Sequence, residues 1–134
     1  MSGYKQTEGK LDMSLLPLRA LIEVAQVFHY GSLKYSRSNW LKGLRLYELR
    51  QAQKRHEGKF DLGQQIDTES GLFHLAHKAC LALMELELYL QNNLLGDDGS
   101  LLYLNRALSA YSEDELFSCR FKHPKRVLST DNTK

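Results

Sequence analysis

Apolar residues recur at three- and four-residue spacing along most of the chain, which is the pattern of amphipathic helices. The first predicted helix begins between Ser14 and Pro17 and ends at Tyr30, where Gly31 suits the residue after a helix end. Its apolar residues form two adjacent stripes, one of Leu18, Leu21, Ile22, Ala25 and Phe28, the other of Ala20, Val24 and Val27. Because a helix that is apolar on two sides is usually covered on two sides, we expect contact with other subunits.

Two further long helices follow in the pattern. The second covers about Leu44 to Glu57, ends at Gly58 and has a heavily charged surface. The third covers about Thr68 to Asn93 and is the longest and most apolar, with a seam of Leu72, Leu75, Ala76, Ala79, Leu83, Leu86 and Leu90. A loop, YGSLKYSRSNWLKG, joins the first two, and KFDLGQQ joins the second to the third.

The rest of the chain predicts shorter elements. GDDGS, at 96–100, is a turn, and LLYLNRALSAY after it has helical spacing. Ser112 and Glu115 form a capping box, which predicts a last short helix to about Phe121. No stretch alternates convincingly with a period of two, so the expected class is all-α. The expected architecture is a bundle of about four to five helices, completed by oligomerisation.

Length and composition support one domain. A chain of 134 residues with 43% hydrophobic and 25% charged residues is typical of a globular protein. We assign an N-terminal arm to 1–13, a single domain to 14–121 and a tail to 122–134. No apolar run reaches the roughly 20 residues of a membrane span, and the N-terminus lacks an apolar signal core. Cys80 and Cys119 share no motif, which indicates reduced thiols in the cytoplasm.

Charge is distributed unevenly along the chain. Residues 1–117 carry 13 basic and 15 acidic side chains, whereas residues 118–134 carry five basic and one acidic. A basic tail of this kind is able to contact nucleic acid, but it is more often a solvated chain end. We therefore do not expect nucleic acid as a partner.

The densest chemistry lies in DTESGLFHLAHKA, residues 67–79. On a helix, Ser70, His74 and His77 share one face that reaches back to Asp67, with Glu69 in the first turn. Oxygen ligands suit Mg²⁺ or Mn²⁺, and imidazole shifts the preference toward Mn²⁺, Zn²⁺ or Fe. Acids at a helix start are also stabilised by the helix dipole without a metal, and such histidines are commonly ordinary hydrogen-bonded residues.

Other candidates have equally plain alternatives. Glu23 is the only acid on the first predicted helix and either joins this site or pairs with Arg19. The loop supplies cations and flat side chains that suit a triphosphate and a base: Lys34, Tyr35, Arg37, Asn39, Trp40 and Lys42. Trp40 is as readily a core anchor for that loop, and Arg55 and His56 suit a helix C-terminus.

The order of these residues resembles a known family. The shared pattern runs through Leu16-Pro17, Glu23-Val24-Ala25, Tyr30-Gly31, Lys34-Tyr35, Asn39-Trp40, Lys42-Gly43, Arg55-His56, Asp67, Glu69-Ser70-Gly71, His74 and His77. It resembles the phage dATP/dGTP diphosphohydrolases, within the all-α MazG-type nucleotide pyrophosphohydrolases, over about residues 14 to 90. The wider group carries an E-x-x-E and an E-x-x-D motif. Here the first is Glu23-Val-Ala-Gln26, and the second has no direct copy.

The resemblance implies hydrolysis of dGTP or dATP to the monophosphate and pyrophosphate, with two or more Mg²⁺ or Mn²⁺ ions. It implies a homo-oligomer, with a tetramer favoured, that remodels the dNTP pool in the host cytoplasm during phage infection. Catalytic candidates are Glu23, Asp67 and Glu69, and metal ligands are these three with His74 and His77. Substrate contacts fall on Lys34, Tyr35, Asn39, Trp40, Lys42 and Arg55.

The sequence bears on two other classes of function. A non-catalytic helical oligomer that binds nucleotide or DNA remains the alternative. A phosphohydrolase of the His-Asp-doublet type needs adjacent histidine and aspartate, and the sequence has no such pair.

Overall fold

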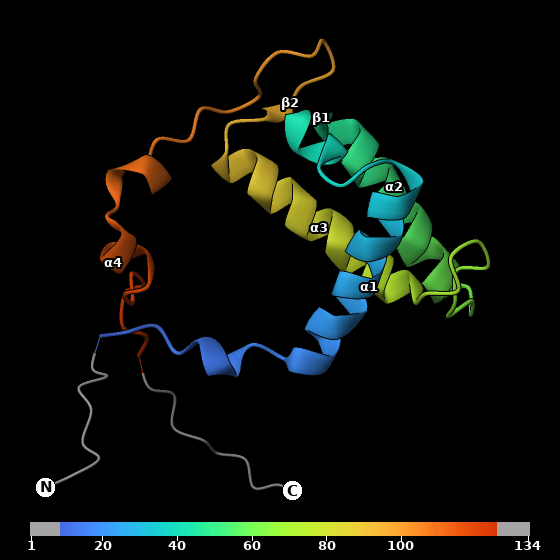
Figure 1. Cartoon of the computed structure of the whole chain (residues 1–134), viewed down its shortest axis with the longest axis horizontal. Helices are drawn as coiled ribbons and strands as arrows, with labels where there is room; N and C mark the ends of the chain where they lie inside the picture. The colour runs from blue at the N-terminus through green and yellow to red at the C-terminus, as the bar shows by residue number, and fades with distance from the viewer. Residues whose placement is uncertain (1–8, 126–134) are drawn as a thin grey trace, which may run out of the picture.

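Two antiparallel helices form the centre of the molecule. The computed structural model describes residues 9–125, and within them α2 (Leu46–Asp61) packs along α3 (His74–Leu90) (Figure 1). The ion pair between Arg50 and Glu85, at 2.7 Å, joins the start of α2 to the end of α3. A second pair, Glu57 with Lys78 at 3.5 Å, joins the opposite ends. The sequence prediction ended α2 at Gly58, but the helix continues to Asp61.

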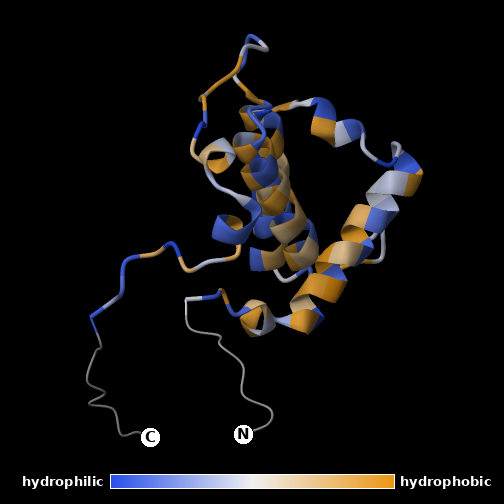
Figure 2. Ribbon diagram, turned by 60° about the vertical axis from the view of Figure 1, so that its left-hand side comes forward, coloured by the Kyte–Doolittle hydropathy of each residue, from blue (hydrophilic) through white to orange (hydrophobic). Residues whose placement is uncertain are grey.

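The first helix, α1 (Leu18–Lys34), crosses α3 and packs against it through small apolar side chains. Val24 and Val27 are buried against Ala76 and Cys80. Both valines belong to one predicted stripe, whose third member, Ala20, is exposed. On the other stripe, Leu18, Leu21 and Ile22 are exposed, whereas Phe28 is half-buried and packs against the same cluster. Figure 2 shows hydrophobic colour over most of the first half of α1. The helix also runs through Gly31, which was expected to follow its end.

A second apolar cluster lies between the start of α2 and the end of α3. Leu49, Leu88 and Leu94 are almost fully buried, and Trp40 packs against them. Next to this cluster, β1 (Leu44–Arg45) pairs in parallel with β2 (Leu94–Leu95), with Leu44 opposite Leu94. The prediction of no strand therefore missed one two-residue pair, while the all-α class is confirmed.

The third helix is shorter than the sequence predicted. It begins at His74 instead of Thr68. The Asp67 side chain accepts a hydrogen bond from the backbone amide of Ser70, and Gly71 adopts a left-handed φ of 75°. Both features make a turn that a continuous helix excludes. The acids Asp67 and Glu69 therefore lie on a turn before α3, and the helical face proposed for Ser70, His74 and His77 does not exist as such.

The remaining chain forms an arc beside the helices (Figure 1). It contains a 3₁₀ turn (Met13–Leu15), a second one (Leu108–Ala110) and α4 (Glu113–Leu116). The ends of the arc are joined where Lys10 bridges Ser118 in antiparallel fashion. The helix predicted over LLYLNRALSAY is wrong except for Leu108–Ala110, because Asn92 holds the backbone of Asn105 in an extended path through two hydrogen bonds.

The capping box predicted from SEDE is confirmed. Ser112 accepts the amide of Glu115, and Glu115 accepts the amide of Ser112 in return. The 3₁₀ turn of Asn39–Lys42 precedes β1, and its Trp40 packs against the cluster of Leu49, Leu88 and Leu94. No helix in residues 9–125 has the length and apolar character to cross a membrane. Most of the basic tail at 122–134 lies outside the described residues.

Candidate active site

A cavity of about 800 Å³ lies between α1, the loop after it, α2 and the turn before α3. Its floor is apolar and includes Val27, Leu81 and Met84. Cys80 also reaches this floor, where burial raises the pKa of its thiol to about 12 and keeps it protonated. The size is that of pockets which hold small organic ligands.

The cations of this cavity come from α1, its loop and α2. Lys34, Arg37 and Arg55 all line it, so positive charge from three separate segments surrounds one space. Of the predicted phosphate contacts, Lys34 and Arg55 are brought together, whereas Lys42 is outside the lining. Arg37 was noted in the sequence but given no role. Converging cations favour an anionic ligand such as a polyphosphate.

Flat side chains lie on the same side of the cavity. Trp40 packs its ring against Phe28, with ring centres 5.8 Å apart, and both line the space. Trp40 also packs against the second core cluster, so it anchors the loop and at the same time lines the cavity. Tyr35 and Asn39 line the rim, and Tyr35 is largely exposed.

Asp67 is fixed in place by its own turn. Its Oδ2 accepts hydrogen bonds from the Ser70 amide at 2.9 Å and the Ser70 hydroxyl at 2.7 Å. Burial raises the pKa of this carboxyl, but the two Ser70 bonds outweigh burial and hold it below its usual value. The residue is therefore an ionised carboxylate on the cavity wall at neutral pH.

Glu69 forms an ion pair across the cavity mouth. Lys34 Nζ donates to Glu69 Oε2 at 2.5 Å, and the Tyr30 hydroxyl donates to the same oxygen at 3.2 Å. These two donors lower the pKa of Glu69, and the same contact raises the pKa of Lys34. One predicted metal ligand and one predicted phosphate contact are thus paired with each other.

Three histidines and Asp67 make a compact cluster at the inner end. His56 stacks flat on His77, with ring centres 4.4 Å apart and an interplanar angle of 5°. His77 Nε2 lies 2.8 Å from the Ser70 hydroxyl and 3.6 Å from Asp67 Oδ2. Burial, reinforced by the neighbouring histidines, lowers the pKa of His56 to about 4, and burial also lowers the pKa of His77. These two rings are neutral at pH 7, which is the form that binds metals.

His74 is the fully buried member of this cluster and has no exposed surface. Its Nδ1 is 2.8 Å from His56 Nδ1, and its Nε2 is 2.8 Å from Gln64 Oε1. One ligand atom each from His56, Asp67 and His74 lie within 4.8 Å of one another, a group able to hold a metal ion. The donor set of carboxylate and imidazole fits a divalent cation.

The structure brings together most, but not all, of the predicted residues. Asp67, Glu69 and His77 share one wall, and His74 lies directly behind it. Glu23 is half-buried on α1 and does not line the cavity. His56 belongs to the same cluster of histidines and Asp67, although the sequence predicted no role for it in the site. Its only indication in the sequence was its place beside Arg55 in the ordered family pattern.

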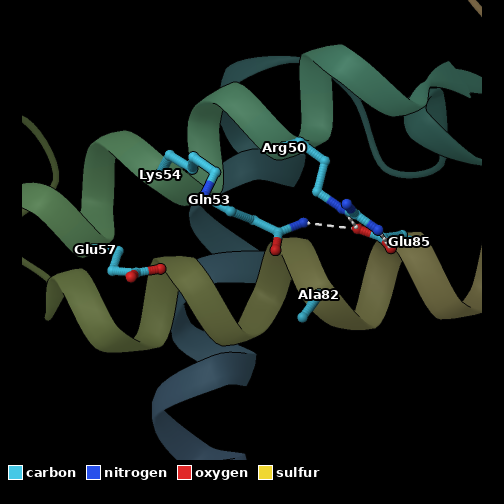
Figure 3. A pocket seen from close by; sticks show the side chains of 6 residues that line it. All are labelled: Arg50, Gln53, Lys54, Glu57, Ala82 and Glu85. Atoms are coloured by element: carbon cyan, nitrogen blue, oxygen red, sulfur yellow. Dashed lines mark hydrogen bonds and ion pairs between the residues drawn. The ribbon is translucent and has the colours of Figure 1, made fainter.

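A smaller polar groove lies between α2 and α3. Figure 3 shows that its cation Arg50 points to Glu85, to which it donates two hydrogen bonds, and Gln53 adds a third. Lys54 and Glu57 line its other end. Because its charges neutralise one another and it lacks aromatic side chains, the groove does not compete with the larger cavity as a nucleotide site.

These observations define a small all-α protein with one cation-ringed cavity whose inner wall carries carboxylates and imidazoles. The chain belongs to the family described as dATP/dGTP diphosphohydrolase, N-terminal, whose model matches residues 1–98. A protein of Salmonella phage PMBT28 named dATP/dGTP diphosphohydrolase is 40% identical over 98 residues, which is 73% of this chain. The chain spans about a third of that relative's length. No solved structure matches the chain.

Proposed function

We propose that this chain hydrolyses purine deoxynucleoside triphosphates, dGTP or dATP, to the monophosphate and pyrophosphate. The observation that carries the proposal is the single cavity in which Lys34, Arg37 and Arg55 face a wall of Asp67, Glu69 and His77. The family and the name of the phage relative support the same reaction and the same substrates.

The binding roles follow from position and charge. Lys34 and Arg55 bind the triphosphate, because a chain of phosphates carries several negative charges and needs donors from more than one direction. Trp40 and Tyr35 offer flat surfaces for the base or sugar, and Asn39 lies beside them at the rim. We assign no substrate contact to Lys42, because it lies outside the lining of this cavity.

The reaction is an in-line displacement at the α-phosphorus. Water forms a new bond to that phosphorus, the bond to the oxygen bridging to the β-phosphorus breaks, and pyrophosphate leaves with the bonding electrons. Two or more Mg²⁺ or Mn²⁺ ions, when bound, neutralise the charge on the phosphate oxygens and acidify the attacking water. We assign Asp67 and Glu69 as the acids that would hold them, because both line the cavity and His77 lies beside Asp67, and one carboxylate would accept the proton of the water.

We place this activity in a homo-oligomer encoded by a phage, acting on the dNTP pool in the host cytoplasm. The phage source of the relative supports the setting. The exposed stripe of α1 supports assembly, because Leu18, Leu21 and Ile22 are 39% or more exposed.

The test is a panel of purified nucleotides incubated with Mg²⁺ or Mn²⁺, with pyrophosphate and orthophosphate measured separately. We expect pyrophosphate and a deoxynucleoside monophosphate from dGTP or dATP, and at least a tenfold loss of rate in Glu69→Gln. Orthophosphate as the sole phosphate product would exclude the proposed bond. Binding without turnover of any nucleotide would instead favour a non-catalytic nucleotide-binding protein.

A further inference from the structure

We propose that His56, His74 and Asp67 bind one divalent transition-metal ion, with His56 as a ligand from α2. The inference deepens the proposed function, because it rests on the same cavity and shares Asp67 with it. It differs in assigning a nitrogen-rich site that selects transition metals over Mg²⁺.

The first argument is convergence from three elements. His56 comes from α2, Asp67 from the turn and His74 from the start of α3, yet one ligand atom of each lies within 4.8 Å of the others. His56 and Asp67 also line the cavity, so an ion has a path of entry. Such a meeting of two imidazoles and a carboxylate is a common ligand set for transition metals.

The second argument is the orientation of His74. The carbonyl oxygen of Gln64 only accepts hydrogen bonds, so the 2.8 Å contact places the proton of His74 on Nε2. The lone pair is then on Nδ1, which points at His56. In a metal-binding histidine, the ring nitrogen that does not bind the ion usually donates a hydrogen bond to a carbonyl or carboxylate oxygen.

The third argument is the space between the two imidazoles. Their Nδ1 atoms lie 2.8 Å apart, a distance at which they share one proton. Two nitrogens bound to one ion, each at about 2.0–2.1 Å, lie about 3.0–3.4 Å from each other. A shift of well under an ångström, with the His56 proton moving from Nδ1 to Nε2, therefore makes room for an ion between the two Nδ1 atoms. His56 is the ring able to make that shift, because it is half-buried and faces the cavity.

The fourth argument concerns Asp67 and His77. The bonds from Ser70 fall on Asp67 Oδ2, which leaves Oδ1 without a hydrogen-bond partner among residues 9–125. His77 uses Nε2 to contact the Ser70 hydroxyl and lies flat on His56, so it holds the His56 ring in place. In this arrangement His77 is a positioning residue for His56.

The test measures binding directly, by calorimetric titration of chelator-treated protein with Zn²⁺, Mn²⁺ and Mg²⁺. We expect one Zn²⁺ per chain with an affinity at least tenfold above that for Mg²⁺, and at least a tenfold loss in His56→Gln. His123→Gln is the matched control, because the His123 ring lies beside Phe121, far along the chain from the cluster. Equal affinity for Zn²⁺ and Mg²⁺, or no change in His56→Gln, would overturn the proposal.

A second measurement on the unaltered protein covers the case in which His56→Gln does not fold. In nitrogen NMR, Zn²⁺ is expected to shift Nδ1 of both His56 and His74, and unshifted signals would contradict the site. Nucleotide turnover with Mg²⁺ alone is followed in parallel. Turnover without a Zn²⁺ site removes only this inference, whereas Zn²⁺ binding without turnover of any nucleotide removes only the proposed function.

Discussion

Glu69 has two competing partners in the proposed reaction. Its carboxylate is paired with Lys34 and accepts a hydrogen bond from the Tyr30 hydroxyl, and it is also one of the two acids that we propose as ligands of a divalent ion. If an ion takes Glu69, Lys34 loses its partner and its ammonium is available to the triphosphate. Metal binding and substrate binding are then coupled through one salt bridge at the mouth of the cavity.

Lys34 and Lys42 were both predicted from the sequence to contact phosphate, but only Lys34 lines the cavity. Lys34→Met is expected to raise the KM for dGTP or dATP at least tenfold, because the substrate loses a charged contact inside the cavity. Lys42→Met is the matched control and is expected to change KM less than twofold, since Lys42 lies outside the lining. Steady-state kinetics of both variants measures the difference, and equal effects would mean that the substrate extends beyond this cavity.

At the level of elements, the sequence predicted those features correctly that depend only on neighbouring residues. The Ser112 capping box is such a case, because both of its hydrogen bonds lie within four residues. Local propensity predicts helix ends at Gly31 and Gly58, but both glycines lie inside helices. The cost of glycine in a helix is about 1 kcal/mol, which packing of α1 and α2 on α3 readily offsets.

Gly58 therefore provides a test of the continued helix. A Cβ at Gly58 meets nothing within 4 Å, so Gly58→Ala is expected to stabilise the protein by about 0.5–1 kcal/mol. Gly43→Ala is expected to destabilise it, because Gly43 has a φ of 123° and its Cβ would lie 3.2 Å from Leu95 Cδ1. Chemical denaturation of both variants measures the two signs. Loss of stability in Gly58→Ala would contradict a helix through this residue.

The candidate site shows what the sequence was able to indicate. The ordered pattern indicated the residue types, and Lys34, Trp40, Arg55 and Asp67 do meet at one cavity. The role of His56 was not available from spacing, because it depends on how α2 lies along α3 and so brings His56 onto His74. Long-range packing of this kind leaves no periodic trace in either helix.

On the scale of the whole molecule, the arc extends beyond the family match. The matched region ends at residue 98, whereas the arc continues to α4 and returns to the N-terminal segment. There the Leu11 amide donates to the Phe117 carbonyl and the Cys119 amide to the Gly9 carbonyl, at 2.8 Å each. Two segments from opposite ends of the described chain thus form one unit, although only one of them lies in the matched region.

The helices bordering this arc leave a large apolar surface uncovered. On α1, Leu18, Leu21 and Ile22 are exposed, and on α3 the outer residues Leu75, Leu83 and Leu86 are 42–52% exposed. Ala79 has helical spacing with these residues of α3, so it lies on the same side of the helix. It also packs against the cluster that contains Val24 of α1, so the two exposed faces adjoin. Exposed apolar patches of this extent are typical of subunit interfaces, and a surface shared by identical chains pairs most simply about a twofold axis.

We therefore expect light scattering after gel filtration to give a mass that is a multiple of the 15.4 kDa chain, and the resemblance favours four. Burial of apolar surface stabilises association by about 25 cal/mol per Å², so a charge placed on that surface opposes it strongly. The double variant Ile22→Asp, Leu86→Asp is expected to run as a monomer. Leu62→Asp is the matched control, because Leu62 is 90% exposed and follows the end of α2, on neither α1 nor α3. A monomeric unaltered chain, or an unchanged mass in the double variant, would show that these faces do not join subunits.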